Sequence, residues 1–275
     1  MTIKFAFSSN AFRNYTIEES ISSIFLSGYS GIEIMCDEPH AFPPLSEKKI
    51  NSIKNTLVKK NLEISNLNGF MMCAIQDFHH PSWIEKNQKF RQIRIDHTKN
   101  CLNLAKRLGA KTVSTEPGGL KNEFSENEAL DSFEKGLNEV LPIAEKNKVK
   151  LLIEPEPDLL IENSSQFLKF ISRFDSKNIG LNFDVGHFFC VGEEPHNVIK
   201  LLQDYVSHIH LEDISKERIH KHLIPGEGII DFRKLFDAID DINYKGFVTI
   251  ELYPYQDKPQ EAAKKALDYV NLCTK

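Results

Sequence analysis

The sequence predicts an α/β protein built as a single-domain (β/α)₈ TIM barrel, and two observations lead to this fold class. Eight short apolar runs alternate with eight longer amphipathic stretches. This alternation predicts a parallel sheet, since each parallel connection needs a crossover helix, and eight such units suggest closure into a barrel. An open doubly wound sheet typically has a glycine-rich turn after the first strand. Residues 8–12 read Ser-Ser-Asn-Ala-Phe and contain no glycine, which argues against that fold.

The individual elements follow in chain order from apolar runs and from apolar residues at helical spacing. Behind the first run, Ile17, Ile21 and Ile24 recur at helical spacing, and Thr16 with Glu19 forms a capping-box signature. The same pattern then repeats along the chain. The predicted strands are 3–7, 32–35, 63–68, 111–114, 149–154, 179–184, 207–211 and 247–252. The predicted helices are 16–26, 46–60, 84–108, 127–147, 164–174, 196–205, 232–241 and 259–272.

Length and composition favour one globular domain over residues 1–275. The chain is 41% apolar and 27% charged, as is ordinary for a globular protein, and barrels of this kind run to roughly 250 residues as one unit. No linker, low-complexity stretch or internal repeat interrupts it. Two long loops, residues 69–83 and 212–230, follow strand C-termini, which is where barrel active sites are built.

Charge and cysteine content narrow the function classes. The 34 basic and 39 acidic residues give a net charge of −5, which argues against a nucleic-acid partner. The five cysteines are odd in number and form no CxxC pair, so we expect neither disulfides nor a cysteine zinc site, and a reducing cytoplasm fits. The N-terminus does not read as a signal peptide, and no apolar run approaches 18 residues, so no membrane partner is expected. A homo-oligomer is left open.

Four successive predicted strands end on residues that could bind a metal. Glu154, Asp184 and Glu251 close the fifth, sixth and eighth strands, and the seventh carries His208 and His210 on one face. A carboxylate directly after a buried apolar run is costly unless it is paired, and a divalent cation would resolve this. Three carboxylates and one imidazole suit Mn²⁺, Mg²⁺ or Co²⁺, with Zn²⁺ as a further candidate.

The spacing leaves two alternatives within this set. One carboxylate at a strand end often just caps the next helix, but four candidate ligands at consecutive strand ends are harder to explain in that way. Strand periodicity does not decide between His208 and His210. Glu156 shares a face with Glu154 and could replace it or bind substrate, but Pro157 follows it, which favours Glu154 as the ligand.

The motifs of the second half resemble those of the xylose-isomerase-like barrel superfamily, in its sugar phosphate isomerase/epimerase branch. Relatives in this superfamily include D-tagatose 3-epimerase, inosose and hydroxypyruvate isomerases, and endonuclease IV. The matching motifs are IEP at 153–155, NFDVGH at 182–187, HIHLED at 208–213, PGEG with a following Ile at 225–229, and IEL at 250–252.

The resemblance implies a metal-dependent isomerase or epimerase acting on a sugar, sugar phosphate or cyclitol. It assigns Glu154, Asp184, His210 and Glu251 as ligands of one divalent metal, with Mn²⁺ as the first expectation. It also implies that Glu154 and Glu251 move protons to and from carbon next to a carbonyl, through a metal-stabilised enediolate.

The resemblance further implies which residues contact the substrate, and it implies an alternative activity. His187 matches a histidine that contacts substrate oxygens, and Lys216 falls near a family arginine. In the endonuclease branch, residues matching His187, His220 and His222 hold a further zinc, so these three could bind a second Zn²⁺ or substrate. An endonuclease IV-like phosphodiesterase is therefore the alternative, although Glu116 stands where that branch has a histidine. A barrel that only binds a sugar-like ligand is a third hypothesis.

Overall fold

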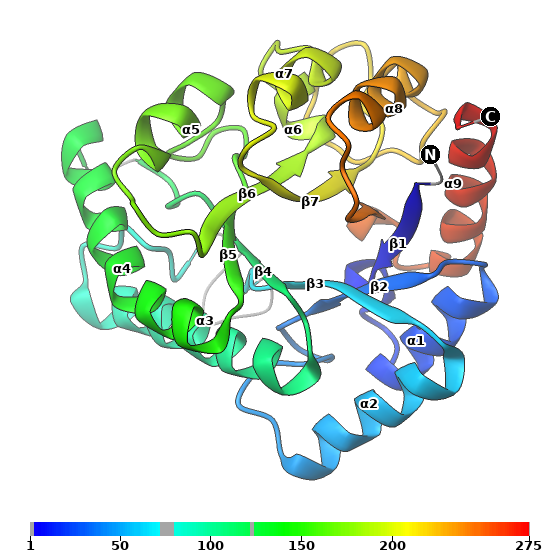
Figure 1. Ribbon diagram of the computed structural model, residues 1–275, viewed down its shortest axis with the longest axis horizontal. Coiled ribbons are helices and arrows are strands. Elements are labelled where there is room, and N and C mark those ends of the chain that lie inside the picture. Colours follow the sequence, from blue (N-terminus) through cyan, green and yellow to red (C-terminus); the bar gives the residue numbers. More distant parts are fainter. Residues whose placement is uncertain (1–2, 72–79, 122–123, 275) are drawn as a thin grey trace.

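The computed structural model describes residues 3–71, 80–121 and 124–274, and these form one closed barrel. Eight parallel strands pair in sequence order and β1 pairs with β8, which confirms the predicted fold. The strands are β1 Lys4–Ser8, β2 Gly31–Met35, β3 Glu63–Asn68, β4 Thr112–Thr115, β5 Lys150–Ile153, β6 Ile179–Asp184, β7 Val206–Leu211 and β8 Phe247–Ile250. Helices surround them on the outside (Figure 1).

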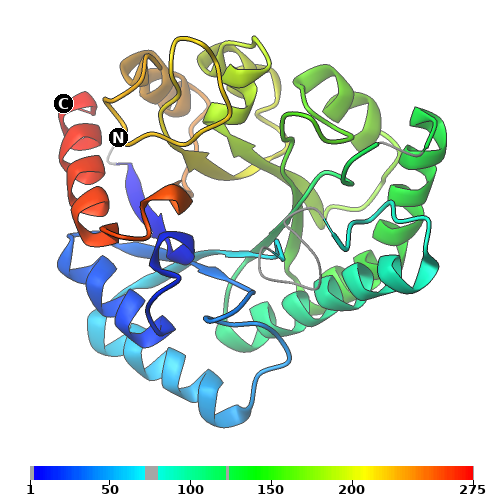
Figure 2. The ribbon, with the colours of Figure 1, turned by 180° about the vertical axis from the view of Figure 1, so that it is seen from behind.

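The helical elements are more numerous than the sequence predicted. The α-helices are α1 Ile17–Leu26, α2 Glu47–Lys60, α3 Gln88–Leu108, α4 Glu126–Asn147, α5 Ser164–Ile171, α6 Val185–Cys190, α7 Pro195–Leu201, α8 Phe232–Asp241 and α9 Pro259–Cys273. Two 3₁₀ turns, η1 Ser9–Phe12 and η2 Tyr253–Tyr255, follow β1 and β8. Both turns lie at the end of the barrel that faces the viewer in Figure 2, together with the long loop after β7.

Local capping explains where several helices begin and end. The predicted capping box is present, since Thr16 accepts from the backbone N–H of Glu19 and Glu19 reaches back to that of Thr16. Ser125 and Glu128 cap α4 in the same way. Helix α3 ends at Gly109, whose φ of 87° lies in the left-handed region that glycine adopts without strain.

Several element boundaries differ from the sequence prediction. Helix α3 begins only after Asn87, which caps it, and not at residue 84. A single helix between β6 and β7 was predicted, but the segment holds α6 and α7, so eight helices is wrong and the described residues contain nine. Strands β5 and β8 end at Ile153 and Ile250, so Glu154 and Glu251 lie one residue beyond them.

The apolar core lies between the strands and the surrounding helices. Phe133 of α4 stacks on Phe170 of α5 with ring centroids 4.9 Å apart, and Trp83 packs against Phe133 at 5.5 Å. The buried indole of Trp83 donates to Thr115 Oγ1 at 2.9 Å, which satisfies its N–H. This packing joins the segment before α3 to the end of β4 and so helps to form the rim of the barrel mouth.

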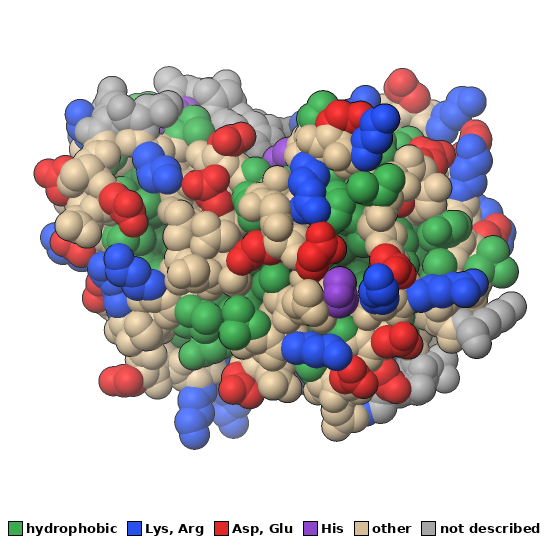
Figure 3. Space-filling view, turned by 90° about the horizontal axis from the view of Figure 1, so that it is seen from above, with side chains coloured by type: hydrophobic (Ala, Val, Ile, Leu, Met, Phe, Trp, Pro, Cys, Tyr) green, Lys and Arg blue, Asp and Glu red, His purple; other side chains and the backbone are tan. Residues whose placement is uncertain are grey.

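Two observations describe the hydropathy of the helices and the charge of one face. Among the described residues, no helix has the length and apolar character needed to cross a bilayer. On the face drawn in Figure 3, acidic and basic side chains are interspersed and do not gather into a basic patch.

Candidate metal centre and active site

The ends of β5 to β8 bring the four predicted ligands together. Glu154, Asp184, His210 and Glu251 each offer a ligand atom, and these atoms all lie within 4.8 Å of one another. From His210 Nδ1 the distances are 2.7 Å to Glu154 Oε1, 3.9 Å to Asp184 Oδ2 and 3.8 Å to Glu251 Oε1. All four side chains are buried, so the carboxylates surround one imidazole nitrogen in a space largely closed to water.

Burial and mutual repulsion shift the titration of this cluster. Burial raises the pKa of Glu154, and it raises that of Glu251 well above the usual value, with neighbouring carboxylates adding to both shifts. Although burial opposes it, Glu154, Glu33 and Glu251 raise the pKa of His210 well above its ordinary value. The site therefore favours positive charge strongly.

The donor set fits a divalent cation. Three carboxylates and one imidazole are the ligands that Mn²⁺, Mg²⁺, Co²⁺ and Zn²⁺ accept in proteins. Asp184 Oδ2 is buried and has no hydrogen-bond partner among the described residues, while Asp184 Oδ1 accepts from the backbone N–H of His187 at 2.7 Å. One oxygen of this carboxylate thus caps α6, and the other is left to face a ligand.

Glu33 on β2 belongs to this centre and was missed by the sequence reading. Its Oε2 lies 2.6 Å from His210 Nε2, on the side of the ring away from Glu154. His208 Nε2 is 3.6 Å from the same oxygen, so the structure brings His210, and not His208, to the ligand cluster. Burial tends to raise the pKa of Glu33, but His210 and His208 hold it well below the usual value. A glutamate between two isoleucines of a buried strand was the signal that could have revealed it.

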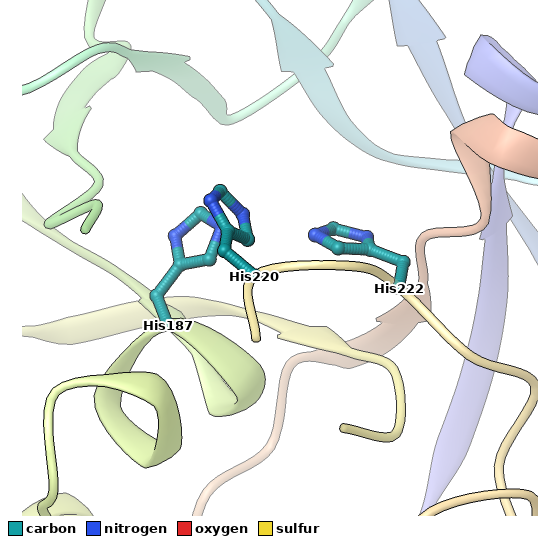
Figure 4. Close-up of side chains that lie close together, drawn as sticks. All are labelled: His187, His220 and His222. Atoms are coloured by element: carbon teal, nitrogen blue, oxygen red, sulfur yellow. The ribbon is translucent and has the colours of Figure 1, made fainter. Parts of the chain in front are cut away.

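A second cluster contains the three predicted histidines. His220 and His222 project from the loop after β7 toward the ring of His187 on α6 (Figure 4). Their ring centroids lie 4.5 Å apart for His187 and His220 and 5.6 Å apart for His220 and His222. Ligand atoms of all three lie within 4.8 Å of one another, so the arrangement can receive a cation or several substrate oxygens.

Backbone carbonyls fix the orientation of two of these rings. His187 Nδ1 lies 2.9 Å from Pro155 O, and His222 Nδ1 lies 2.9 Å from Glu251 O. A carbonyl only accepts, so each Nδ1 carries the proton and each Nε2 keeps a lone pair. Burial lowers the pKa of His187 to about 3 and that of His222 to about 4. Both rings are thus neutral at neutral pH.

Asp213 folds the loop that carries these histidines. Its Oδ2 accepts from the backbone N–H groups of Gly226 and Gly228, each at 2.9 Å, and its Oδ1 accepts from that of Ile230 at 3.1 Å. The backbones of Asp213 and Leu223 also pair. The aspartate of the HIHLED motif and the glycines of PGEG therefore act together to shape the loop.

Glu212 and Gly186 pack tightly beside the candidate metal centre. The backbone N–H of Gly186 donates to Glu212 Oε1 at 2.5 Å, and a Cβ at position 186 would lie 1.9 Å from that oxygen. Burial and the adjacent Asp184 raise the pKa of Glu212 well above its usual value. Glu212, Asp184 and His222 also offer ligand atoms within 4.8 Å of one another.

A cavity of about 390 Å³ opens onto both clusters. Its lining residues are Asn10, Arg13, Asn68, Phe70, Glu154, Glu156, His187, His220, His222, Glu251 and Tyr253. The first half of the chain contributes four of these, Asn10, Arg13, Asn68 and Phe70. Asn10, Arg13, Asn68 and Tyr253 were not predicted from the sequence, because they belong to no recognised motif.

The two remaining predicted substrate residues lie in different surroundings. Glu156 lines the cavity and is buried, and its Oε2 has no partner in the described part of the chain. Burial and then Glu154 raise its pKa well above the usual value. Lys216 instead lies at the surface, with 78% of its side chain exposed and its Nζ 3.8 Å from Glu217 Oε1. Its substrate role stays a prediction that this geometry does not support.

A (β/α)₈ barrel with clustered ligands at the C-terminal ends of four successive strands defines an enzyme-like class with a candidate metal centre. The family model for xylose isomerase-like TIM barrels matches residues 26–273, and the chain belongs to this family.

Individual relatives are distant but cover nearly the whole chain. An inosose dehydratase of Mesomycoplasma hyopneumoniae strain J is 29% identical, over 93% of this chain and 88% of the relative. A crystal structure of a D-tagatose 3-epimerase-like protein is 25% identical with a TM-score of 0.80, covering 98% of this chain and 99% of that one. A structure of the IOLI protein with a bound zinc atom has a TM-score of 0.82 at 20% identity, covering 99% and 98%, and shows the shared fold.

These similarities do not favour the phosphodiesterase alternative, because the relatives described above carry epimerase and dehydratase names. Glu116, which stands where the endonuclease branch has a histidine, is buried with its Oε1 3.2 Å from Arg94 Nε. It is not a cavity-lining residue. The position therefore contributes a buried contact with Arg94 just beyond the end of β4.

Proposed function

We propose that this protein is a divalent-metal-dependent isomerase or epimerase of a small sugar, sugar phosphate or cyclitol. The observation that carries the proposal is the pair of buried glutamates, Glu154 and Glu251, beside His210 in the cavity. They follow β5 and β8, which β6 and β7 separate, so the two carboxyl groups approach the cavity from different directions.

The reaction begins when one glutamate removes the proton from the carbon next to the substrate carbonyl. The other glutamate returns a proton, to the neighbouring carbon in an isomerase or to the opposite face in an epimerase. Burial raises the pKa of both carboxyl groups, and a carboxylate with a raised pKa is the stronger base for removing a proton from carbon. A bound dication would supply charge stabilisation for the enediolate that forms between these two steps.

Neighbouring side chains orient the substrate. The Nε2 lone pairs of His187 and His222 accept hydrogen bonds from substrate hydroxyls, and Asn68 Nδ2 donates to Glu251 Oε1 at 3.3 Å. The cavity volume of about 390 Å³ falls within the range of small-molecule sites. Mn²⁺ is the metal we expect at the four-ligand centre, and His187, His220 and His222 are the site for a second Zn²⁺ if one is bound.

A dehydratase is the second candidate, favoured by the inosose dehydratase relatives. Loss of water from a hydroxy ketone starts with the same proton removal. The leaving hydroxyl group then needs a proton, and Glu156 is the candidate donor, because it lines the cavity and burial raises the pKa of its carboxyl group well above the usual value. The first product is an enol beside the carbonyl, which tautomerises to a 1,2-diketone and so differs from the product of an isomerase.

The first experiment is metal content per chain for wild type, Asp184→Ala and His222→Ala. One equivalent that is lost in Asp184→Ala and kept in His222→Ala supports the mononuclear proposal. Two equivalents, with one lost in His222→Ala, would establish a second metal site at the histidines and would make phosphate-ester hydrolysis the favoured activity. No metal in any sample, even after addition of Mn²⁺ or Zn²⁺, would refute the proposed function.

The second experiment follows ketoses and inososes by ¹H NMR in D₂O at saturating metal. We expect deuterium to enter next to the carbonyl, with Glu154→Gln and Glu251→Gln each slowing it by about 10²- to 10⁴-fold. Glu217→Gln, at an exposed position of the neighbouring loop, is the matched control and should exchange like wild type. A new ketose or aldose marks an isomerase or epimerase, and the signal of a new deoxygenated carbon beside a 1,2-diketone marks a dehydratase. Equal exchange in wild type and both active-site variants would contradict the assigned roles.

A further inference from the structure

The imidazole of His210 is held from both sides. Its Nδ1 faces Glu154 Oε1 at 2.7 Å, and its Nε2 faces Glu33 Oε2 at 2.6 Å. We propose that Glu33 is a positioning residue, which binds the Nε2–H of His210, presents Nδ1 to the metal and thereby sets the metal affinity of the centre. This inference rests on the proposed metal centre and adds a residue from β2, outside the four strands that supply the ligands.

Imidazole chemistry explains why the second contact matters. A neutral ring has one N–H and one lone pair, so a carboxylate that takes the N–H at Nε2 leaves the lone pair at Nδ1. Nδ1 is also the atom that lies within 4 Å of Glu154, Asp184 and Glu251. Histidines that bind metals commonly donate their other N–H to a carboxylate, which fixes the ring and raises its basicity.

Glu33 is itself held rigidly, as a positioning residue must be. Ser8 Oγ donates to its Oε1 and Asn66 Nδ2 donates to its Oε2, both at 2.8 Å. Asn66 Nδ2 also reaches Ser114 Oγ at 2.9 Å. These partners stand on β1, β3 and β4, so β1 to β4 together hold the carboxylate that orients a ligand on β7. The carboxylate is fully buried, and it keeps its place without contact with solvent.

His208 does not compete for this role. Its Nε2 lies 3.6 Å from Glu33 Oε2, beyond hydrogen-bond distance, and its ring meets that of His210 edge to face at 5.3 Å. The carboxylate therefore binds one of the two histidines, and that histidine is the one that reaches Glu154 and Glu251.

The test is metal affinity of chelator-stripped protein, measured with Mn²⁺ and with Zn²⁺ by competition with a chromophoric chelator. Glu33→Gln keeps the size of the side chain and removes its charge, and we expect the dissociation constant to rise by about 10- to 100-fold. The visible spectrum of the Co²⁺-loaded protein should also shift, because ligand geometry changes with the ring. Thr249→Val is the matched control, since Thr249 is buried in the same barrel but hydrogen-bonds Ser65, and its affinity should equal that of wild type.

Equal affinities and equal Co²⁺ spectra in wild type and Glu33→Gln would overturn the inference. If Glu33→Gln fails to fold, Ser8→Ala takes its place, because it removes a donor to Glu33 and leaves the carboxylate. Ser8→Ala should weaken binding several-fold, and unchanged binding there would also overturn the inference. Wild type that binds no metal would refute both this inference and the metal centre. Wild type that binds metal without acting on any sugar would count against the proposed function alone.

Discussion

Replacing Glu116 by glutamine should remove a pH dependence from the stability of the barrel. Burial raises the pKa of this carboxyl group from 4.5 to about 7, although Arg94 acts to lower it. The folded state therefore prefers the protonated group, and its stabilising contribution is complete below pH 4.5 and lost as the pH rises through 7. At about 1.4 kcal/mol per pKa unit, the loss is roughly 3 kcal/mol.

Thermal unfolding of wild type and Glu116→Gln between pH 4.5 and 8 measures this loss. For a chain of this size roughly 3 kcal/mol corresponds to a change of about 5 °C in unfolding temperature. We expect the wild-type value to fall by that amount relative to the variant across the range. Glutamine does not titrate, so the changed contact with Arg94 in the variant adds a constant offset and leaves the slope difference between the two curves intact.

A constant difference between the two curves would refute the reasoning. It would mean that the Arg94 guanidinium, 3.2 Å away, keeps Glu116 ionised in the folded state at pH values where we expect it neutral. Glu139→Gln is the control, because this glutamate is half exposed and pairs with Lys99 on the outer surface. Its curve should run parallel to that of wild type.

Two further predictions concern the metal centre. Gly186→Ala places a Cβ 1.9 Å from Glu212 Oε1 and 2.9 Å from Ile214 Cγ1. We therefore expect the variant to lose about 1–3 kcal/mol of stability in urea unfolding and to bind metal more weakly, because Asp184 is a neighbour. A variant with the stability and metal affinity of wild type would contradict this packing. Chelator treatment should lower the free energy of unfolding of wild type by about 2.7 kcal/mol relative to protein held at a metal concentration 100 times the dissociation constant. Asp184→Ala should show no such change, and an equal drop in both proteins would indicate metal bound elsewhere.

The fold and the four-ligand centre could be predicted from the sequence because their signals are local. Apolar runs, helical spacing and caps mark the elements, and closure follows from their number. The ligands stand at strand ends, and the motif around each of Glu154, Asp184 and Glu251 can be read without the structure. The choice of His210 over His208 needed the family resemblance, since both point to one face of the strand.

The parts that could not be predicted depend on contacts between distant segments. Glu33 and His210 are 177 positions apart in the sequence, and the residues around Glu33 do not indicate which histidine it contacts. Helix α6 was missed because Asp184 both ends β6 and caps the next turn, so strand and helix share a residue. The cavity wall formed by Asn10 and Asn68 follows from strand order in space, which sequence spacing does not encode.

The pairing of β1 with β8 has a consequence for how this protein is made. Lys4 pairs with Phe247, so at about 5–20 residues per second a ribosome needs roughly 12 to 50 seconds to deliver the partner of the first strand. During that time β1 keeps an open edge that can pair with other chains. Glu251 is synthesised later still, so the four-ligand centre cannot form on a nascent chain that lacks β8. Protection of the growing chain must therefore come from chaperones or from its own helices, and metal can stabilise only the finished barrel.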